Sequence, residues 1–211
     1  MTEGTSRIEA FSDGVFAIAI TLLILEVRLQ HVGSEGSLGT SLIALWPYYL
    51  AFALSFFVIL VTWIAHNDLM RLVRETTRPL QLANGLALFY VTFIPFPTAV
   101  LAAHLDGADI RTAVAFYCGT FVLGSVAFNL LVETISRGHL LRPEVDPRTL
   151  ERVRRGYHVT FLIYVAATLL ALVAPWVALA LNVAVRLQIL RVHFHRPAAA
   201  VPSPKRHSLP L

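Results

Sequence analysis

Four stretches of this chain, each longer than 20 residues, contain no Asp, Glu, Lys or Arg; they lie at about 36–67, 80–105, 112–132 and 156–185. A helix rises about 1.5 Å per residue, so about 20 apolar residues cross the ~30 Å hydrocarbon core of a bilayer. Only 14% of the 211 residues are charged, whereas soluble proteins average about 25%. We therefore predict an all-α membrane protein, because a helix satisfies its own backbone hydrogen bonds inside lipid.

The apolar segments divide into six predicted membrane-spanning helices. The last stretch is too long for one crossing and has Pro175 near its middle, and because proline favours the start of a helix, two helices are expected there. Arg186 interrupts the second of these and must reach the interface or meet a partner. In the first segment only Gly14–Leu25 is uncharged, between Asp13 and Glu26. The six helices are expected at about 8–27, 41–65, 80–103, 112–134, 157–174 and 176–192.

The basic residues predict the orientation. If both termini are cytoplasmic, all but two of the 17 basic residues lie on the inner side, and only Arg28 and Arg111 lie outside. This is the positive-inside pattern, which five or seven crossings would spoil. The net charge of +4 therefore indicates a membrane orientation and not a nucleic-acid partner.

One six-helix domain is expected over 1–196, followed by a disordered basic tail at 197–211. The Arg-rich segment 136–156, with Pro143 and Pro147, is expected to be a solvated cytoplasmic loop. The N-terminus has no basic region ahead of its first apolar run, so no cleavable signal peptide is expected. Three tryptophans near predicted helix ends are interpreted as interfacial anchors: Trp46, Trp63 and Trp176.

Motifs for catalysis and for cofactor binding are missing from the sequence. It has no Gly-rich phosphate loop, no His-Glu-x-x-His and no nucleophile elbow. Its single cysteine, Cys118, excludes an internal disulfide and a cysteine-rich metal site. His193 and His195 supply only two ligands and are interpreted as part of the basic tail. We therefore expect neither an enzyme nor a cofactor or metal site.

The first predicted helix carries polar residues that lipid would penalise. A carboxylate inside a membrane helix, such as Asp13, usually faces a partner or water. A purely structural explanation stays open, because Ser12 and Asp13 also suit the positive end of a helix and Arg7 would neutralise a carboxylate.

A stripe of large apolar residues lies on the same helix. Ile18, Leu22 and Leu25 fall at positions i, i+4 and i+7, on one helix face. In an oligomer such a stripe would form stacked hydrophobic rings, which close a pore by excluding water.

These residues resemble the signature of the transmembrane protein 175 family, the endosomal/lysosomal potassium channels and their prokaryotic relatives. The resemblance is most specific in the first helix, where Arg7 is followed by Phe11-Ser12-Asp13 and an apolar run to Leu23. It extends over all six crossings and includes further residues of the second and third helices: Trp63, His66, Asn84 and Phe93–Thr98.

The resemblance implies a potassium-selective cation channel that lacks the Thr-Val-Gly-Tyr-Gly filter, which is also absent from this sequence. It implies that the first helix lines the pore, with a constriction at Ile18, Leu22 and Leu25 and with Thr21 as a polar lining residue. A polar network is expected to hold this helix, formed by Arg7, Phe11, Ser12 and Asp13, with His66 and Asn67 joining it.

Because animal members carry two six-helix repeats and pair as dimers, this single repeat implies a homotetramer. Potassium ions and the lipid bilayer are the expected partners. The basic loop and the lack of targeting signals are consistent with a multi-pass protein of a bacterial plasma membrane.

Two other classes of function stay open. In a secondary transporter, Asp13 would carry a proton or cation, and the expected break at Pro95 and Pro97 suits the interrupted helices of such proteins. In a non-transporting membrane subunit, the polar residues of the first helix would only pack. A proton leak through a channel is a further alternative, and no K⁺ over Na⁺ preference follows from the residues themselves.

Overall fold

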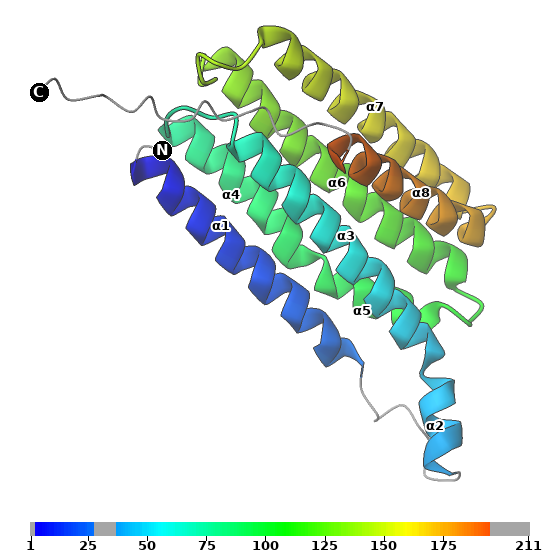
Figure 1. Cartoon of the computed structure of the whole chain (residues 1–211). Coiled ribbons are helices and arrows are strands. Elements are labelled where there is room, and N and C mark those ends of the chain that lie inside the picture. The colour runs from blue at the N-terminus through cyan, green and yellow to red at the C-terminus, as the bar shows by residue number, and fades with distance from the viewer. Residues whose placement is uncertain (1–2, 28–36, 195–211) are drawn as a thin grey trace, which may run out of the picture.

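The computed structural model describes residues 3–27 and 37–194, and its long elements there are all helical. Figure 1 shows the long helices side by side as a bundle, with α1 at one edge and α7 at the opposite edge. α1 packs against α3 and α4, while α6 lies between α4, α5, α7 and α8 and contacts all four. The elements are α1 (Glu3–Leu22), the 3-10 turn η1 (Leu23–Glu26), α2 (Leu38–Ala44), α3 (Trp46–Met70), α4 (Arg78–Phe93), α5 (Pro95–His104), α6 (Ile110–Arg137), α7 (Pro147–Ala171) and α8 (Pro175–Phe194).

Four helical segments of the described chain are long and apolar enough to cross a membrane: Thr5–Glu26, Trp46–Met70, Arg78–His104 and Ile110–Arg137. They correspond to the first four predicted helices. The second was expected over 41–65, but a separate short helix, α2, ends before Leu45, and α3 begins at Trp46 and extends to Met70. The reason is Pro47, which occupies the first turn of α3, where proline is favoured.

Helices are interrupted at the prolines where the sequence predicts a break. α4 ends at Phe93 and α5 begins at Pro95, so Pro95 and Pro97 interrupt the candidate span Arg78–His104. α7 ends at Ala171 and α8 begins at Pro175, so the expected pair of helices is confirmed. In both cases the ring fixes φ and removes a backbone donor, which suits a helix start and not its middle.

The prediction of a loop over 136–156 is wrong in its second half. α7 begins at Pro147, where Asp146 caps the helix by accepting a hydrogen bond from the Arg148 amide at 3.0 Å. A capping aspartate followed by proline is a helix start signal. The many arginines that follow it favoured a solvated loop instead. The predicted tail 197–211 lies outside the described residues, as does His195.

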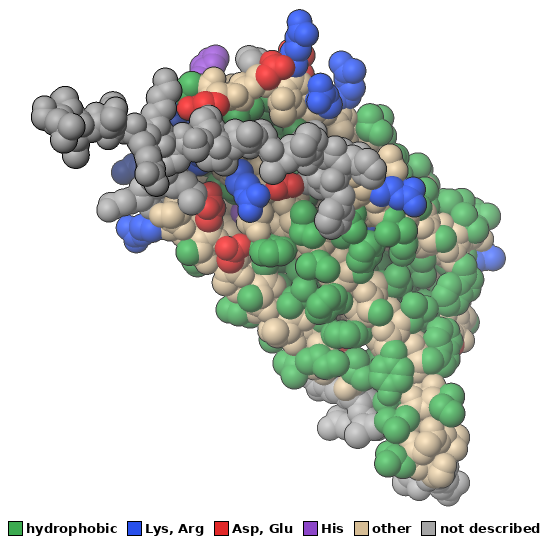
Figure 2. Space-filling view, viewed as in Figure 1, with side chains coloured by type: hydrophobic (Ala, Val, Ile, Leu, Met, Phe, Trp, Pro, Cys, Tyr) green, Lys and Arg blue, Asp and Glu red, His purple; other side chains and the backbone are tan. Residues whose placement is uncertain are grey.

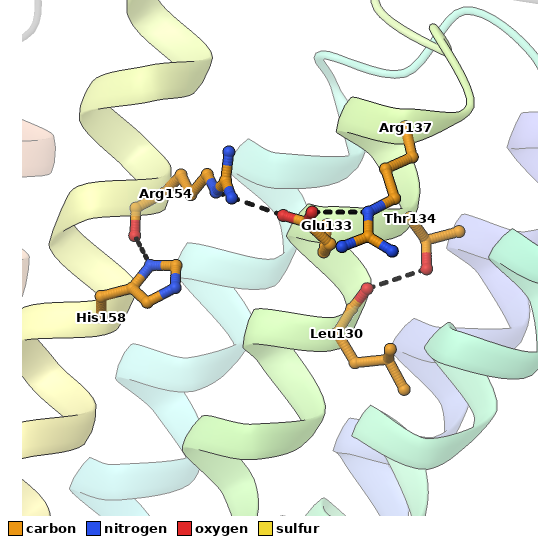
Figure 3. A network of polar contacts seen from close by, with 6 residues as sticks. All are labelled: Leu130, Glu133, Thr134, Arg137, Arg154 and His158. Atoms are coloured by element: carbon orange, nitrogen blue, oxygen red, sulfur yellow. Dashed lines mark hydrogen bonds and ion pairs between the residues drawn. The ribbon is translucent and has the colours of Figure 1, made fainter.

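Charged contacts hold the beginning of α7 against α6. Glu133 accepts a hydrogen bond from Arg137 Nε at 2.7 Å and pairs with Arg154 Nε at 3.2 Å (Figure 3). Nearby, the connections after α3 and after α6 meet in an antiparallel bridge between Val73 and Leu141. Arg154 therefore makes a tertiary contact between α7 and α6.

Charge is distributed unevenly over the surface. Figure 2 shows most visible charged side chains at the end of the bundle where α1 begins, and hydrophobic side chains over much of the remaining face. An apolar belt next to a charged end is the surface expected of a protein that lies in a bilayer.

Two close contacts fix the position of α6 and α8. A methyl group on Gly124 of α6 would overlap the ring of Tyr90 on α4, so only glycine allows this approach. Arg186 of α8 is buried, and its guanidinium donates to Thr62 Oγ1 of α3 at 3.0 Å. Arg186 thus meets a partner, one of the two outcomes that the sequence required.

Candidate pore-lining helix and its polar anchor

One face of α1 carries exposed apolar side chains. The three residues of the predicted stripe are all exposed, by 60% at Ile18, 42% at Leu22 and 56% at Leu25. On the same helix a methyl group added to Gly14 would meet nothing within 4 Å. Hydrophobic side chains exposed on an edge helix leave a surface that lipid or another subunit must cover.

The end of this helix tightens its turn. Leu23–Glu26 forms a 3-10 helix, in which side chains three residues apart eclipse each other. Leu22 and Leu25 therefore stay close to one line along the exposed face, while Leu23 is completely buried. Thr21 is exposed too, and its hydroxyl donates to the carbonyl of Ile18 at 2.9 Å.

The opposite face of α1 is anchored by hydrogen bonds to α3 and α4. Asn84 of α4 donates from Nδ2 to Ser12 Oγ at 3.1 Å, and its Oδ1 accepts from His66 Nε2 at 2.7 Å. All three side chains are almost fully buried. A buried polar chain of this kind is stabilising only when its members are paired, so it fixes how these three helices fit together.

A second contact lies one residue along α1. The indole Nε1 of Trp63 donates to Asp13 Oδ1 at 2.8 Å. Trp63 and His66 are three residues apart and so share a face of α3. The rings of Phe16 and Phe128 approach His66 to 5.4 and 6.3 Å between centroids. The ring of Phe16 on α1 and the ring of Phe128 on α6 therefore cover the polar chain at His66.

The structure brings together only part of the predicted network. Ser12, Asp13 and His66 belong to it, whereas Arg7 and Phe11 are exposed. Asn67 is half-buried, and within residues 3–27 and 37–194 no hydrogen bond joins its side chain to the network.

Two members of the observed network, Trp63 and Asn84, are not among the residues predicted to form it. The sequence pattern predicts an interfacial anchor for Trp63 and assigns no role to Asn84. Their positions offered a signal, because Trp63 lies one turn before His66 and Asn84 is a polar residue among the mostly apolar residues 82–91 of α4.

Within the described chain no group of three or more His, Cys, Asp or Glu side chains could hold a metal ion.

Together the apolar helices, the charged end and the anchored edge helix define a multi-pass α-helical membrane protein whose first helix exposes an apolar face. A family model described as endosomal/lysosomal potassium channel TMEM175 matches residues 7–95. The chain is 41% identical to a potassium channel of Chamaesiphon minutus, over 82% of this chain and 87% of that protein. The chain therefore belongs to the TMEM175 family.

Other relatives agree in sequence and in structure. The chain is 30% identical to the bovine endosomal/lysosomal proton channel TMEM175, over 93% of this chain but 41% of that protein. A crystal structure of a lysosomal potassium-selective channel TMEM175 homologue from Chamaesiphon minutus superimposes with a TM-score of 0.78 at 36% identity. The superposition covers 89% of this chain and 97% of the other.

Proposed function

We propose that this chain is a potassium-permeable cation channel whose conduction path is lined by α1. The observation that carries the proposal is the two-sided character of α1: one face is held by the buried Ser12 and by Asp13, and the other face leaves Ile18, Leu22 and Leu25 exposed. A helix that is hydrogen-bonded on one side and exposes apolar side chains on the other suits a pore wall better than a mobile carrier element. Membership of a family whose relatives are described as potassium and proton channels supports the same function.

The constriction would consist of rings of Ile18, Leu22 and Leu25 from several copies, with Thr21 hydroxyls beside them. Such rings close a pore by excluding water and supply no oxygen ligands. A homotetramer is the assembly we propose. The match covers 41% of the longer bovine protein, so that protein has room for two units of this size. If two such double-length chains pair, four copies of this chain form the equivalent assembly. Arg7 and Phe11, which are exposed near the start of α1, would then contact a neighbouring copy, and Asn67 would support the anchor from α3.

For the topology we propose six crossings with both termini cytoplasmic, in a plasma membrane. α7 and α8 would be the fifth and sixth crossings, within a channel domain over 1–196 that is followed by a basic tail at 197–211. The antiparallel succession of the long helices and the charged end seen in Figure 2 support this arrangement.

Ion flux from proteoliposomes tests the proposal. We expect purified wild-type protein to release K⁺ faster than Na⁺, and Leu25→Ser to raise both fluxes and to lower their ratio, because a polar ring no longer excludes water. Leu162→Ser is the matched control, since Leu162 is also exposed, by 65%, but lies on α7 at the other edge of the bundle.

Each alternative has its own outcome. No flux of either ion from assembled protein would favour a non-transporting subunit. Flux that needs an opposing proton gradient and that Asp13→Asn abolishes would favour a transporter. Equal effects of Leu25→Ser and Leu162→Ser would refute the constriction. Proton flux without K⁺ would make the chain a proton channel.

A further inference from the structure

A cleft opens on the side of the bundle away from α1. It has a volume of about 600 Å³ and lies between α3, α6, α7 and α8. Sites for small organic molecules span about 300–1,000 Å³ and are mostly apolar with a few polar groups. Apolar side chains from all four helices form most of its walls, among them Val61, Leu69, Phe128, Ile163 and Ile189.

A buried cation lies at one end of this cleft. Arg186 is 6% exposed, and its guanidinium lies 5.2 Å from the ring centroids of both Phe121 and Tyr164. One guanidinium nitrogen donates to Thr62, and the side chain of Tyr90 is a further neighbour. No carboxylate of residues 3–27 or 37–194 forms an ion pair with Arg186.

Hydrogen-bonding capacity is left over at this end. Among the described residues, the buried Arg186 Nε has no hydrogen-bond partner, and neither has the hydroxyl of Tyr164, whose side chain is 3% exposed. Both residues line the cleft. A buried charge without a counter-ion is costly, and so is a buried donor that makes no hydrogen bond. An anion between these two groups would relieve both.

The other end of the cleft is also basic. Arg152 and Arg155, both exposed, line it on α7, and Asp68 lines it on α3. The excess of positive charge attracts anions toward the opening. A hydrated inorganic ion would lose its water along apolar walls without compensation, whereas an apolar body on the anion gains by contact with them.

We infer that this cleft binds an organic anion, meaning a carboxylate, sulfonate or phosphate attached to an apolar body. The anionic group pairs with Arg186 and accepts the Tyr164 hydroxyl, and the apolar body lies against the walls between α3, α6 and α7. This chemistry has two sources, an anionic lipid of the bilayer or a soluble organic acid. The site is separate from α1, so it stands or falls independently of the channel.

Binding is measured on purified full-length protein in a neutral detergent. Octanesulfonate and benzoate are titrated while thermal unfolding is followed by tryptophan fluorescence, with octanol and benzyl alcohol as uncharged counterparts. We expect the two anions to stabilise the protein and the alcohols not to. Failure of both anions, together with no preference for an anionic lipid, would overturn the inference.

Two reconstitution arms separate the sources. Protein is placed in nanodiscs of phosphatidylcholine with or without phosphatidylglycerol, and native mass spectrometry counts the lipids that stay bound. Retention of phosphatidylglycerol assigns the ligand to the bilayer. Binding of benzoate without such retention assigns it to a soluble acid.

Variants locate the site. Tyr164→Phe removes one hydroxyl and should weaken octanesulfonate binding about two- to tenfold, and Arg186→Gln should weaken it at least tenfold, because bonds to charged groups are stronger. Arg148→Gln, which removes an exposed charge of α7 outside the cleft, should leave binding unchanged.

Tyr164→Phe keeps the test decisive if Arg186→Gln does not fold. Unchanged affinity in Tyr164→Phe, or an equal loss in Arg148→Gln, would show that the anion binds elsewhere.

Discussion

Replacing Asn84 by alanine should loosen α1 from the rest of the bundle. Asn84 joins Ser12 of α1 to His66 of α3, at 3.1 and 2.7 Å, and alanine leaves both partners buried without this bond. In soluble proteins a buried group that loses its partner costs about 1–3 kcal/mol. Side-chain bonds between membrane helices average about 0.6 kcal/mol and reach about 1.7. Because two such bonds are lost, we expect a destabilisation of about 1–3 kcal/mol.

Two assays on the same variant measure this loss and its consequence. Unfolding of the purified protein by a denaturing detergent gives the change in stability, and flux from proteoliposomes gives the ratio of K⁺ to Na⁺. We expect the ratio to fall toward one, because a loosened α1 no longer holds its exposed face in a fixed position.

A matched control separates loss of stability from loss of position. Asn129 of α6 donates to the carbonyl of Ser125 and, at 3.3 Å, to that of Tyr157 on α7, and it has no bond to α1. Asn129→Ala should destabilise the bundle without changing the flux ratio. A normal flux ratio in Asn84→Ala, or the same change in both variants, would refute the idea that the polar anchor positions the pore wall.

Three further substitutions are checked by the same unfolding assay. Gly124→Ala should destabilise the protein by about 1–3 kcal/mol through overlap with Tyr90, and an unchanged midpoint would mean that α4 and α6 can separate freely. Trp63→Phe keeps a ring but removes the donor to Asp13, so it should cost about 0.5–1.5 kcal/mol; equal stability would make this bond dispensable. Glu133→Gln removes the negative charge of two partly exposed ion pairs, so its effect should stay below about 1 kcal/mol and shrink in salt. A loss that high salt does not reduce would contradict this explanation.

Local features of the sequence predicted the membrane character and the helical breaks. Apolar stretches without charge determine transfer into lipid residue by residue, and Pro95 and Pro175 act within one turn of their own positions. The two predicted breaks are present, between α4 and α5 and between α7 and α8. The helix start at Pro147 differs from the prediction, because the many arginines nearby indicate a solvated loop whereas Asp146 and Pro147 form a local capping pattern.

The helical spacing of the exposed stripe of α1 could be predicted from the sequence, but what the stripe faces could not. Ile18 and Leu22 recur at helical spacing whether they face lipid, a neighbour or the core. Only the packing of α1 against α3 and α4 leaves that face exposed and Leu23 buried. The reason is that a helix sequence specifies which residues share a face, whereas the rotation of the helix is decided by its neighbours.

The sequence by itself therefore determined an all-helical membrane protein with a charged end and an unusual first helix, because hydropathy, charge and proline act locally. Tertiary structure alone decided which polar groups meet. Trp63 reaches Asp13 across 50 positions of the chain, and Arg186 reaches Thr62 across 124. Such pairs depend on the depth and rotation of two packed helices, and no local pattern encodes either. The same packing leaves Arg186 and Tyr164 facing a cleft.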